Sequence, residues 1–496
     1  MMAPSHTSLA DIAELLHIAP VDGSITGVCA DNRRVRPGDL FVAIHGASVH
    51  AARFARSAVE AGAAAVLTDA EGAAIAGDVG VPVLVVEDPA RVAGLVASYC
   101  YGRPDEKLTT FAVTGTNGKT STAYMIDDAL VHLGRTTGLI GTVEVRIAGE
   151  AVPAQLTTPQ PVDLQRMLAR LVERGGTDLV METSSHALAQ GRTEPIRFDV
   201  AGFTNLTQDH LDYHKTLEEY FRAKAVLFDS DHCERGVITV DDEWGRRLYR
   251  EVSERRPGAA VSLSVRGNDA DWRVASTLDG GVQTIQLTGP AGTLDTFTSL
   301  PGSFNVANAA LAAVMVMESG VSAQALASAL GEDGISPTIP GRMEVVGEHP
   351  YTVVDFAHNT DALVKAMTSL RAARGGRLVV ITGSAGDRDR GKRPKMAAAV
   401  AEHADYLVIT DDDPHSEDPA QIRRDLIAGI PQGFDYVEIA DREQAIITTI
   451  MACGSDDTIL IAGRGHETIQ EVADRAISID DRVVARTALT QRMEGE

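Results

Sequence analysis

The sequence predicts an α/β protein of three domains, with a central P-loop domain around a parallel sheet and a C-terminal Rossmann-like domain. Three observations lead to this fold class. The chain has 496 residues, which is too long for a single hydrophobic core. Short β-branched apolar segments alternate with segments of helical spacing. Two polar segments that contain glycine and proline, residues 101–107 and 336–341, read as boundaries between domains.

The first domain, residues 1–103, is expected to mix strands at 39–44, 63–67 and 81–86 with a helix at 53–62. The second domain, residues 104–338, alternates strands (108–114, 178–181, 200–203, 236–240) with helices (121–133, 217–228), which is typical of a mostly parallel sheet. The third domain, residues 339–496, repeats this pattern with strands at 351–354, 377–382, 406–410 and 458–462. Its ligand is therefore expected at the C-terminal ends of those strands.

The composition is that of an ordinary soluble protein, with 44% hydrophobic and 23% charged residues. A formal net charge of −24 disfavours a nucleic-acid surface, although a local basic pocket can still hold an anionic substrate. The four scattered cysteines predict neither a disulfide framework nor a zinc site, and they suit a reducing cytoplasm. Because we find no export signal and no apolar run of about 20 residues, we expect no membrane insertion.

A glycine-rich loop, Gly115-Thr-Asn-Gly-Lys-Thr120, joins the predicted strand 108–114 to the predicted helix 121–133. In that setting, backbone N–H groups and a helix N-terminus point at an anion. Lys119 adds a charge for the β- and γ-phosphates, and the Thr120 hydroxyl can ligate Mg²⁺. Val113 stands where the longer form of the motif has its first glycine, so this is the shorter Gly-x-x-Gly-Lys-Thr form. The loop predicts nucleotide binding, with an ordinary turn and a solvated lysine as the alternative.

Two polar loops that follow neighbouring predicted strands hold further candidates. Glu182 comes directly after strand 178–181, where a carboxylate close to a phosphate loop is a natural Mg²⁺ ligand. The loop after strand 200–203, Thr204-Asn-Leu-Thr-Gln-Asp-His-Leu-Asp-Tyr-His214, holds two histidines and two aspartates. An exposed acid and a surface histidine are the plainer interpretations. Two such loops on neighbouring strands favour a functional role for Glu182 and His210.

Lys224 shares one predicted helical face with four apolar or aromatic residues of the segment 220–228. In one interpretation, its stem is buried and its ammonium group reaches water. In another, the amine is partly desolvated, its pKa is lowered and more of it is neutral. A neutral amine can react with CO₂ to form a carbamate, which acts as a carboxylate metal ligand. The pattern alone leaves these interpretations open.

Taken together, these motifs resemble the central domain of the Mur ligases. The segments that carry this resemblance are Gly115–Thr120, Glu182-x-Ser-Ser-His186, Thr204–His214 and Tyr220-Phe-x-Ala-Lys224. Four further segments extend it towards the C-terminus: Leu300-Pro-Gly-x-Phe-Asn-Val-x-Asn308, Gly341-Arg-Met-Glu344, Asp355-Phe-Ala-His358 and Gly386-Asp-Arg-Asp-Arg-Gly-Lys-Arg-Pro394. Gly38-Asp-Leu-Phe-Val-Ala43 and Thr157-Thr-Pro159 resemble the tripeptide-forming type of this family. The resemblance covers essentially the whole chain.

The resemblance implies a ligase that uses ATP to add an amino acid to UDP-N-acetylmuramoyl-L-alanyl-D-glutamate through an acyl phosphate, in peptidoglycan precursor synthesis. Lys119 and two Mg²⁺ ions would offset the repulsion among the anions that meet there. The expected catalytic residues are Lys119, Glu182, His210 and Lys224. The expected metal ligands are Thr120, Glu182, His210 and Lys224 as its carbamate. The expected ATP contacts are Gly115, Thr116, Asn117, Gly118, Lys119, Thr120, Ser121, Asn305, Asn308, Arg342 and Asp355.

The resemblance also implies two sets of substrate contacts. Those for the UDP substrate are Ala30, Asn32, Thr157, Thr158, Ser184, Gln190 and Arg192. Those for the incoming amino acid are Arg388, Asp412, Asp413, His415, Gly463 and Glu467, with Arg388, Gly463 and Glu467 at its α-carboxylate and α-amino end. The expected partners are small molecules rather than nucleic acid, and we expect a cytoplasmic monomer. A sister ligase such as folylpolyglutamate synthase is the alternative.

The identity of the added amino acid is predicted from the acidic segment at 410–419. Members that add meso-diaminopimelate carry Asp-Asn-Pro-Arg here, and the arginine grips the distal carboxylate. In this chain Asp413 and His415 replace the asparagine and the arginine. At an effective dielectric near 20, a unit-charge swap about 4 Å away is worth roughly 4 kcal/mol, enough to reverse a preference. We therefore expect L-lysine first and L-ornithine second, with meso-diaminopimelate as the alternative. If the acidic segment is only a solvated loop, it has no influence on the choice.

Overall fold

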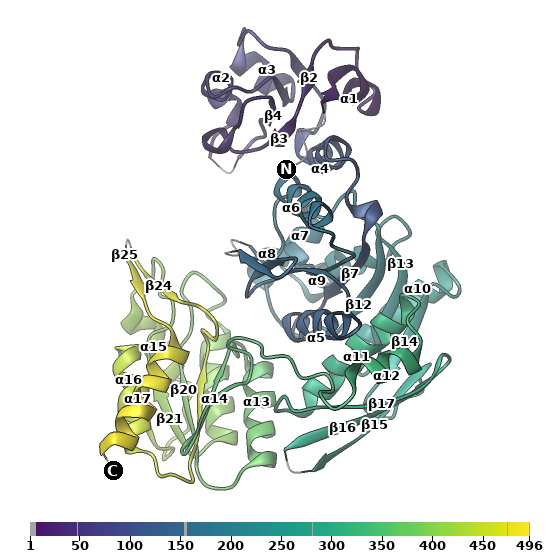
Figure 1. Cartoon of the computed structure of the whole chain (residues 1–496). Helices are drawn as coiled ribbons and strands as arrows, with labels where there is room; N and C mark the ends of the chain where they lie inside the picture. The colour runs from purple at the N-terminus through teal and green to yellow at the C-terminus, as the bar shows by residue number, and fades with distance from the viewer. Residues whose placement is uncertain (1–5, 47, 153–155, 280, 474, 496) are drawn as a thin grey trace.

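The computed structural model describes residues 6–46, 48–152, 156–279, 281–473 and 475–495. Three sheets of four or more strands follow one another along an elongated molecule, as Figure 1 shows. The N-terminal sheet lies at one end, the 11-stranded sheet in the middle and the six-stranded sheet at the other end. The α/β class predicted from the sequence is confirmed.

The N-terminal sheet is parallel, in the order β3-β4-β5-β6. Its strands are β3 (Gly27–Cys29), β4 (Asp39–Val42), β5 (Ala65–Thr68) and β6 (Val83–Val85). Its helices are α1 (Leu9–Leu15), α2 (Ala55–Glu60), α3 (Ala70–Ala76) and α4 (Pro89–Cys100), and β1 (Thr7–Ser8) pairs separately with β2 (Ser24–Ile25). The helix predicted at 53–62 is split, because a 3₁₀ turn, Ala51–Phe54, precedes α2 and is capped by the His50 side chain.

The central sheet has the order β10-β9-β8-β11-β7-β12-β13-β14-β15-β16-β17. The seven strands from β8 to β15 in this order are parallel, and β9, β10, β16 and β17 are antiparallel additions at the two edges. The strands are β7 (Thr109–Thr114), β8 (Thr137–Ile140), β9 (Val145–Ile147), β10 (Glu150–Val152), β11 (Asp178–Glu182), β12 (Phe198–Phe203), β13 (Cys233–Thr239), β14 (Ala260–Ser264), β15 (Trp272–Asp279), β16 (Val282–Gly289) and β17 (Gly292–Thr298). The four strands predicted here are therefore present within a larger sheet.

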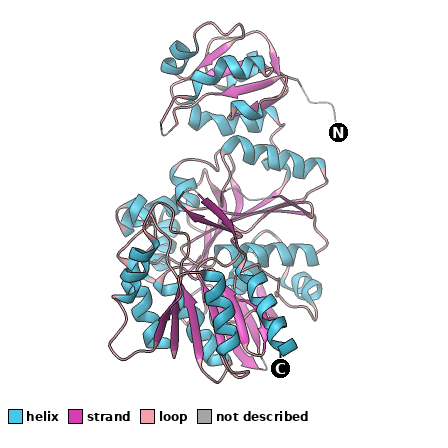
Figure 2. Ribbon diagram, turned by 90° about the vertical axis from the view of Figure 1, so that its left-hand side faces the viewer, coloured by secondary structure: helices cyan, strands magenta, loops and turns pink. Residues whose placement is uncertain are grey.

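Helices cover both faces of the central sheet (Figure 2). One apolar cluster contains residues of α5 (Lys119–His132), α11 (Ser303–Glu318) and α12 (Ala323–Leu330). The other contains residues of α6 (Pro161–Glu173), α7 (Ser185–Ala189), α9 (Leu217–Ala225) and α10 (Glu243–Arg255), and the short α8 (Leu211–His214) lies close to α9. The helix predicted over 217–228 ends earlier, since its last three residues form a 3₁₀ turn.

The C-terminal sheet has the order β18-β19-β23-β20-β21-β22, and all its strands except β18 are parallel. The strands are β18 (Glu344–Glu348), β19 (Tyr351–Asp355), β20 (Leu378–Thr382), β21 (Tyr406–Ile409), β22 (Tyr436–Glu438) and β23 (Thr458–Ala462). The helices are α13 (Thr360–Ala373), α14 (Lys392–His403), α15 (Pro419–Ile427), α16 (Arg442–Ala452) and α17 (Asp481–Gly495). A hairpin of β24 (Ile469–Val472) and β25 (Arg475–Ser478) projects from this part. The four predicted strands are confirmed.

Across the described ranges, no helix combines the length and the apolarity that a bilayer-spanning segment needs.

A buried ion pair ties α16 to α17 beneath the C-terminal ends of the sheet. The Nε and Nη2 groups of Arg442 donate to Asp481 at 2.9 and 2.7 Å, and both side chains are 0% exposed. Nη2 also donates to the carbonyl of Ala462 at the end of β23. Nη1 donates to the carbonyl of Asp411 at 3.4 Å. Because both charged groups are buried, removing either partner would leave the other charge uncompensated.

We expect Arg442→Leu to lower the free energy of unfolding of the C-terminal domain by about 3 to 5 kcal/mol, because it leaves Asp481 buried and unpaired. Urea unfolding followed by hydrogen exchange of β19, β20 and β23 measures this change. The matched control is Arg424→Leu, whose ion pair with Asp418 is exposed and should contribute less than about 1 kcal/mol. Equal effects of the two variants would contradict the assignment.

Candidate active site

The C-terminal ends of four neighbouring parallel strands bring the candidate residues to one edge of the central sheet. The strand order β8-β11-β7-β12 places the residues after each strand side by side. Thr142 follows β8, Glu182 ends β11, the glycine-rich loop follows β7 and Thr204 follows β12. Because parallel strands end at the same edge, segments far apart in the sequence meet here.

The Glu182 carboxylate is buried at this edge and is fixed by hydrogen bonds. Its Oε2 accepts from the hydroxyls of Thr120 and Thr142, both at 3.0 Å, and its Oε1 accepts from the backbone N–H of Thr142 at 2.8 Å. Gly141 is required beside it, since a Cβ there would lie 2.3 Å from Oε1. A carboxylate and two hydroxyls are hard oxygen donors, so this set fits Mg²⁺.

The glycine-rich loop folds around the ammonium group of Lys119. The Lys119 ammonium donates to the carbonyls of Gly115 and Thr116 at 3.1 and 2.9 Å. Burial lowers the pKa of Lys119, against the opposing effect of Glu182. Gly118 caps α5 with a φ of 93°, which a side chain would strain. An anionic ligand in the loop would compensate the buried ammonium.

Helix α11 closes the loop from the side. A Cβ on Gly118 would lie 2.5 Å from the Asn308 carboxamide oxygen, so this contact is close. The Nδ2 group of Asn308 donates to Asn305, and that of Asn305 donates to the carbonyl of Pro301. The structure thus brings Asn305 and Asn308 to the predicted ATP loop.

Lys224 is buried beside the same loop. Its ammonium donates to the carbonyl of Gly115 at 2.7 Å and lies 4.6 Å from the centre of the Tyr220 ring. Burial, reinforced by nearby Lys119, lowers the pKa of Lys224 well below its ordinary value. Lys224 as a whole is 1% exposed, so the interpretation in which its ammonium group reaches water is wrong. Lys224 is instead desolvated, as the second interpretation predicted.

His210 lies next to these groups at the start of α8, with a φ of 52° that is rare for a residue with a side chain. Partial burial lowers its pKa to about 4, with Lys119 and Lys224 contributing, so its imidazole is neutral at pH 7. A neutral imidazole has a free lone pair for a metal ion. The His186 ring stands edge-on to it, with ring centroids 5.0 Å apart.

The C-terminal domain contacts this edge through residues near β19. The Arg342 guanidinium stacks on the Phe356 ring at 4.2 Å, and burial lowers its pKa although Glu182 and Asp355 oppose the shift. Asp355 holds the adjoining backbone by accepting from the N–H of Met343 at 2.7 Å.

A direct hydrogen bond joins the loop to α13. The Asn117 carboxamide donates to Asp361 at 2.8 Å, across 244 residues of sequence. The predicted ATP contacts therefore come from both domains.

Five of the seven residues predicted to bind the UDP substrate form one network next to Glu182. The Thr158 hydroxyl donates to the Glu182 carbonyl and accepts from the Ser184 N–H, and the Thr157 hydroxyl meets that of Thr142 at 3.1 Å. The Arg192 guanidinium donates to the Gln190 carboxamide and to the Thr158 carbonyl.

The remaining two residues predicted to bind the UDP substrate lie in the N-terminal domain. Ala30 follows β3, and Asn32 donates to the Ser57 hydroxyl at 3.2 Å. Within the ranges that the structure describes, neither forms a hydrogen bond with the five residues of the central network.

The residues predicted for the amino acid lie at the C-terminal ends of β20, β21 and β23. One carboxylate oxygen from each of Asp412, Asp413 and Glu467 lies within 4.8 Å of the others. Burial and the two aspartates raise the pKa of Glu467 to about 8. The carboxylate of Asp412 lies against Gly463, where a Cβ would stand 2.4 Å from its Oδ2.

Arg388 and His415 lie beside this acidic cluster without contacting its carboxylates. Arg388 lies on the exposed loop between β20 and α14, and its guanidinium donates to the carbonyl of Asp387. The ring of His415 pairs with Glu471 at 3.0 Å.

Asp413 does not add a free negative charge to the amino-acid pocket, so this part of the sequence-based prediction is wrong. Its Oδ1 forms an ion pair with Arg464 at 2.6 Å and accepts from the Glu471 N–H at 3.0 Å. The carboxylate that replaces asparagine at position 413 is therefore compensated inside the protein by a guanidinium 51 residues away in the sequence.

Three site residues were not predicted. Thr142 follows a strand that the sequence analysis did not include, although its position after the buried segment 137–140 was a usable signal. Arg464 stands between Gly463 and Glu467, both of which were predicted. Asp361 gave no local signal, because its partner Asn117 lies in another domain.

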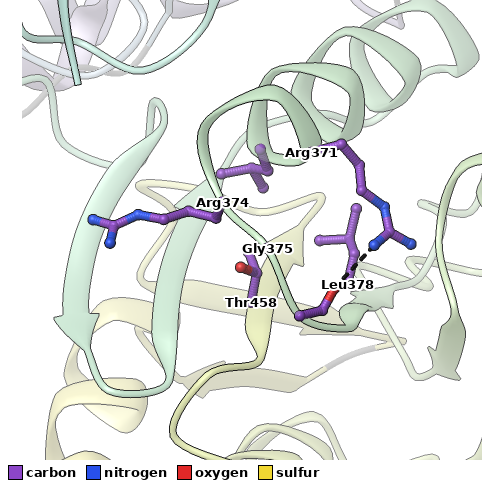
Figure 3. A pocket seen from close by; sticks show the side chains of 7 residues that line it. Arg371, Arg374, Gly375, Leu378 and Thr458 are labelled. Atoms are coloured by element: carbon purple, nitrogen blue, oxygen red, sulfur yellow. Dashed lines mark hydrogen bonds between the residues drawn. The ribbon is translucent and has the colours of Figure 1, made fainter. Parts of the chain in front are cut away.

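A shallow hollow lies at the opposite end of the C-terminal sheet, where α13 ends and β20 and β23 begin (Figure 3). Its rim includes Arg371, which donates to the carbonyl of Gly376 at 3.1 Å, and Arg374, which points away from Arg371. None of the predicted site residues lines it.

Family models match three stretches of the chain. They are the Mur ligase family, catalytic domain (residues 24–101), the Mur ligase middle domain (residues 113–316) and the Mur ligase, glutamate ligase domain (residues 341–465). The middle-domain match contains the glycine-rich loop, Glu182 and Lys224.

Two curated relatives match almost the whole chain. One is the UDP-N-acetylmuramoyl-L-alanyl-D-glutamate--2,6-diaminopimelate ligase of Streptomyces coelicolor, 42% identical over 499 residues, with 98% of this chain and 97% of the relative covered. The other is the UDP-N-acetylmuramyl-tripeptide synthetase of Leifsonia xyli subsp. xyli, 42% identical over 506 residues, with 99% and 98% covered.

A solved structure of a UDP-N-acetylmuramoyl-L-alanyl-D-glutamate--2,6-diaminopimelate ligase superposes with a TM-score of 0.67 at 30% identity, covering 99% of this chain and 100% of that one. The sequence and fold matches thus extend over all three sheets and include the phosphate-binding loop. The chain belongs to the Mur ligase family and is an ATP-dependent ligase.

Proposed function

We propose that this ligase adds 2,6-diaminopimelate to UDP-N-acetylmuramoyl-L-alanyl-D-glutamate in the synthesis of peptidoglycan precursors. The γ-phosphoryl group of ATP passes to the D-glutamyl carboxylate, which gives ADP and an acyl phosphate. The amino group of the incoming amino acid attacks the acyl carbon, and inorganic phosphate and a proton leave as the amide forms. The observation that carries this proposal is the convergence of Lys119, Glu182 and Lys224 at one edge of the central sheet.

The protein's main task in this reaction is charge compensation. ATP, the substrate carboxylate and the acyl phosphate are all anions, and they must meet at one place. Lys119 would bind the β- and γ-phosphates from the loop, and Arg342 would approach them from the C-terminal domain. Mg²⁺, held by Thr120, Glu182 and His210, would supply positive charge next to the transferred phosphoryl group. Asp355 holds the backbone next to Arg342 in position.

Lys224 is proposed to act as a carbamate. Its desolvated amine is the form that reacts with CO₂, and the product is a carboxylate-like group at a buried position beside the glycine-rich loop. With His210 it would provide the second metal position. The role of the lysine is then to supply an oxygen ligand beside the glycine-rich loop.

The UDP substrate is proposed to lie across two domains. Thr157, Thr158, Ser184, Gln190 and Arg192 would hold the muramoyl dipeptide beside Glu182, as their shared network suggests. Ala30 and Asn32 would hold the nucleotide end from the N-terminal domain. We propose that residues 1–103 form the domain for the UDP substrate, residues 104–338 the ATP-binding domain, and residues 339–496 the domain that binds the incoming amino acid. The monomeric state and the cytoplasmic location stay predictions.

The choice of amino acid changes from the one predicted from the sequence. Four relatives of 39 to 42% identity are named as 2,6-diaminopimelate ligases, which favours this amino acid over lysine or ornithine. The pairing of Asp413 with Arg464 also removes the charge argument that favoured lysine. L-Lysine is the second candidate, because Asp412 and Glu467 form an acidic surface that suits a distal ammonium group.

Replacing Lys224 with alanine should lower the rate of ADP release roughly 100-fold or more, since it removes a ligand from a charge-compensating centre. Acetate should restore part of the activity by placing a small carboxylate in the vacated space. Steady-state assays of ADP release with all three substrates measure both effects. Lys107→Ala, a change at an exposed position in the segment 101–107, serves as the control and should leave the rate unchanged. If the Lys224→Ala variant keeps normal turnover, the role given to Lys224 is wrong.

The purified protein should show a kcat/KM for 2,6-diaminopimelate at least about tenfold above that for L-lysine or L-ornithine, because one ion pair to a distal carboxylate contributes about that factor. The assay measures ADP release with the UDP-muramoyl dipeptide and each amino acid in turn. A preference for lysine or ornithine would support the substrate predicted from the sequence and contradict 2,6-diaminopimelate. No ADP release with any amino acid would contradict the proposed function itself.

A further inference from the structure

Two buried arginines near the C-terminal ends of the six-stranded sheet differ in how completely they are paired. Arg442 is 2% exposed and uses Nε, Nη1 and Nη2 in hydrogen bonds. Arg464 is 0% exposed, yet only its Nη1 has a partner, Asp413. The Nε and Nη2 of Arg464 are buried without a hydrogen-bond partner in the described chain. A buried donor without an acceptor is unfavourable, so these two groups call for an acceptor that the protein does not provide.

The acceptor that suits Arg464 is a carboxylate. A guanidinium presents parallel N–H groups in a planar fork that matches two carboxylate oxygens. Asp413 already occupies one nitrogen, so the Nε and Nη2 groups remain as donors for one further anion. Buried Nε and Nη2 groups without an acceptor are thus typical of a ligand-binding arginine rather than of one whose donors are all used within the protein.

The neighbours of Arg464 have the opposite charge. Asp412, Asp413 and Glu467 bring their carboxylate oxygens within 4.8 Å of one another, and Arg464 contacts one of them. Glu467 lies three residues from Arg464, in the tight turn that links β23 to β24. Buried carboxylates crowded in this way favour a cationic ligand. A guanidinium with two unused donors and the carboxyl groups of Asp412 and Glu467 therefore lie side by side.

We propose that Arg464 is a specificity residue that binds the distal carboxylate of the incoming amino acid, while Asp412 and Glu467 take its distal ammonium group. The resemblance implied the α-amino end for Glu467, and its position next to Asp412 is the reason for this change. This inference rests on the proposed function and names how the site selects its substrate. A distal centre with both a carboxylate and an ammonium group satisfies both halves of the site. Lysine and ornithine offer only the ammonium group and leave the Nε and Nη2 groups of Arg464 without an acceptor. The guanidinium absent at position 415 is thus supplied from position 464.

His415 does not perform this task, because its ring nitrogen is paired with Glu471. Strand β24 covers the site: the N–H of Glu471 donates to Asp413, and the Gln470 carboxamide donates to the carbonyl of Asp412. Figure 1 shows the hairpin of β24 and β25 at the margin of the domain.

The test compares kcat/KM for 2,6-diaminopimelate and for L-lysine in the wild type, in Arg464→Met and in the double variant Asp413→Asn/Arg464→Met. The double variant removes both charges of the internal ion pair, so no unpaired Asp413 remains. We expect both variants to lose at least 100-fold for diaminopimelate and to change less than threefold for lysine. Arg464→Lys keeps a positive charge without the fork and should lose about tenfold for diaminopimelate. Arg424→Met, an exposed arginine of the same domain, is the control.

Three results would overturn the inference. Equal losses for both amino acids would make Arg464 a structural partner of Asp413 only. An unchanged kcat/KM for diaminopimelate in Arg464→Met would show that no distal carboxylate binds there. A wild-type preference for lysine would remove the ligand on which the inference depends, while leaving an active ligase. Should the methionine variant not fold, as judged by its thermal melt, Arg464→Lys and the double variant carry the same comparison.

Discussion

The carboxylate of Glu182 is the point at which the two substrate sites of the central domain meet. Its side chain accepts from Thr120 in the phosphate-binding loop, and its backbone carbonyl accepts from Thr158 in the network proposed for the UDP substrate. One residue at the end of β11 thereby holds both the Thr120 hydroxyl, a proposed metal ligand, and Thr158, a proposed substrate contact. This coupling is possible because β7, β8 and β11 are parallel neighbours that end at the same edge.

Charge is distributed unevenly between the two halves of the proposed reaction. Buried basic side chains surround the glycine-rich loop, and burial lowers the pKa values of Lys119, Lys224 and Arg342. Buried carboxylates surround the proposed amino-acid site, where the pKa of Glu467 is raised to about 8. Each site therefore has groups that its proposed ligand can compensate: the phosphates of ATP at the loop, and the ammonium groups of the amino acid at the carboxylates. The bound ATP, acid and amine would supply the missing charges, and ligand binding would stabilise both sites.

Much of the architecture follows from short-range patterns. The glycine-rich loop, its strand and its helix are local, since residues 108 to 133 contain all the spacing that they require. The buried strands of the C-terminal domain were also predicted, because a strand that is buried on both faces of a parallel sheet is a short continuous run of apolar, β-branched residues. The edge strands β15, β16 and β17 were not predicted, since they are half exposed and their pairing depends on one another. The end of α9 at Ala225 depends on packing and was placed three residues too late.

The residues proposed to carry the chemistry could be predicted from the sequence. Lys119, Glu182 and His210 follow predicted strands, and Lys224 lies on a predicted helical face. Which charges compensate one another could not be read in this way. Asp413 looked like a free acid in an acidic segment, and only the folded chain brings Arg464 to it across 51 residues. Asn117 and Asp361 likewise meet across 244 residues. Periodicity and spacing act over a few residues, whereas an ion pair forms wherever packing places two side chains within about 4 Å.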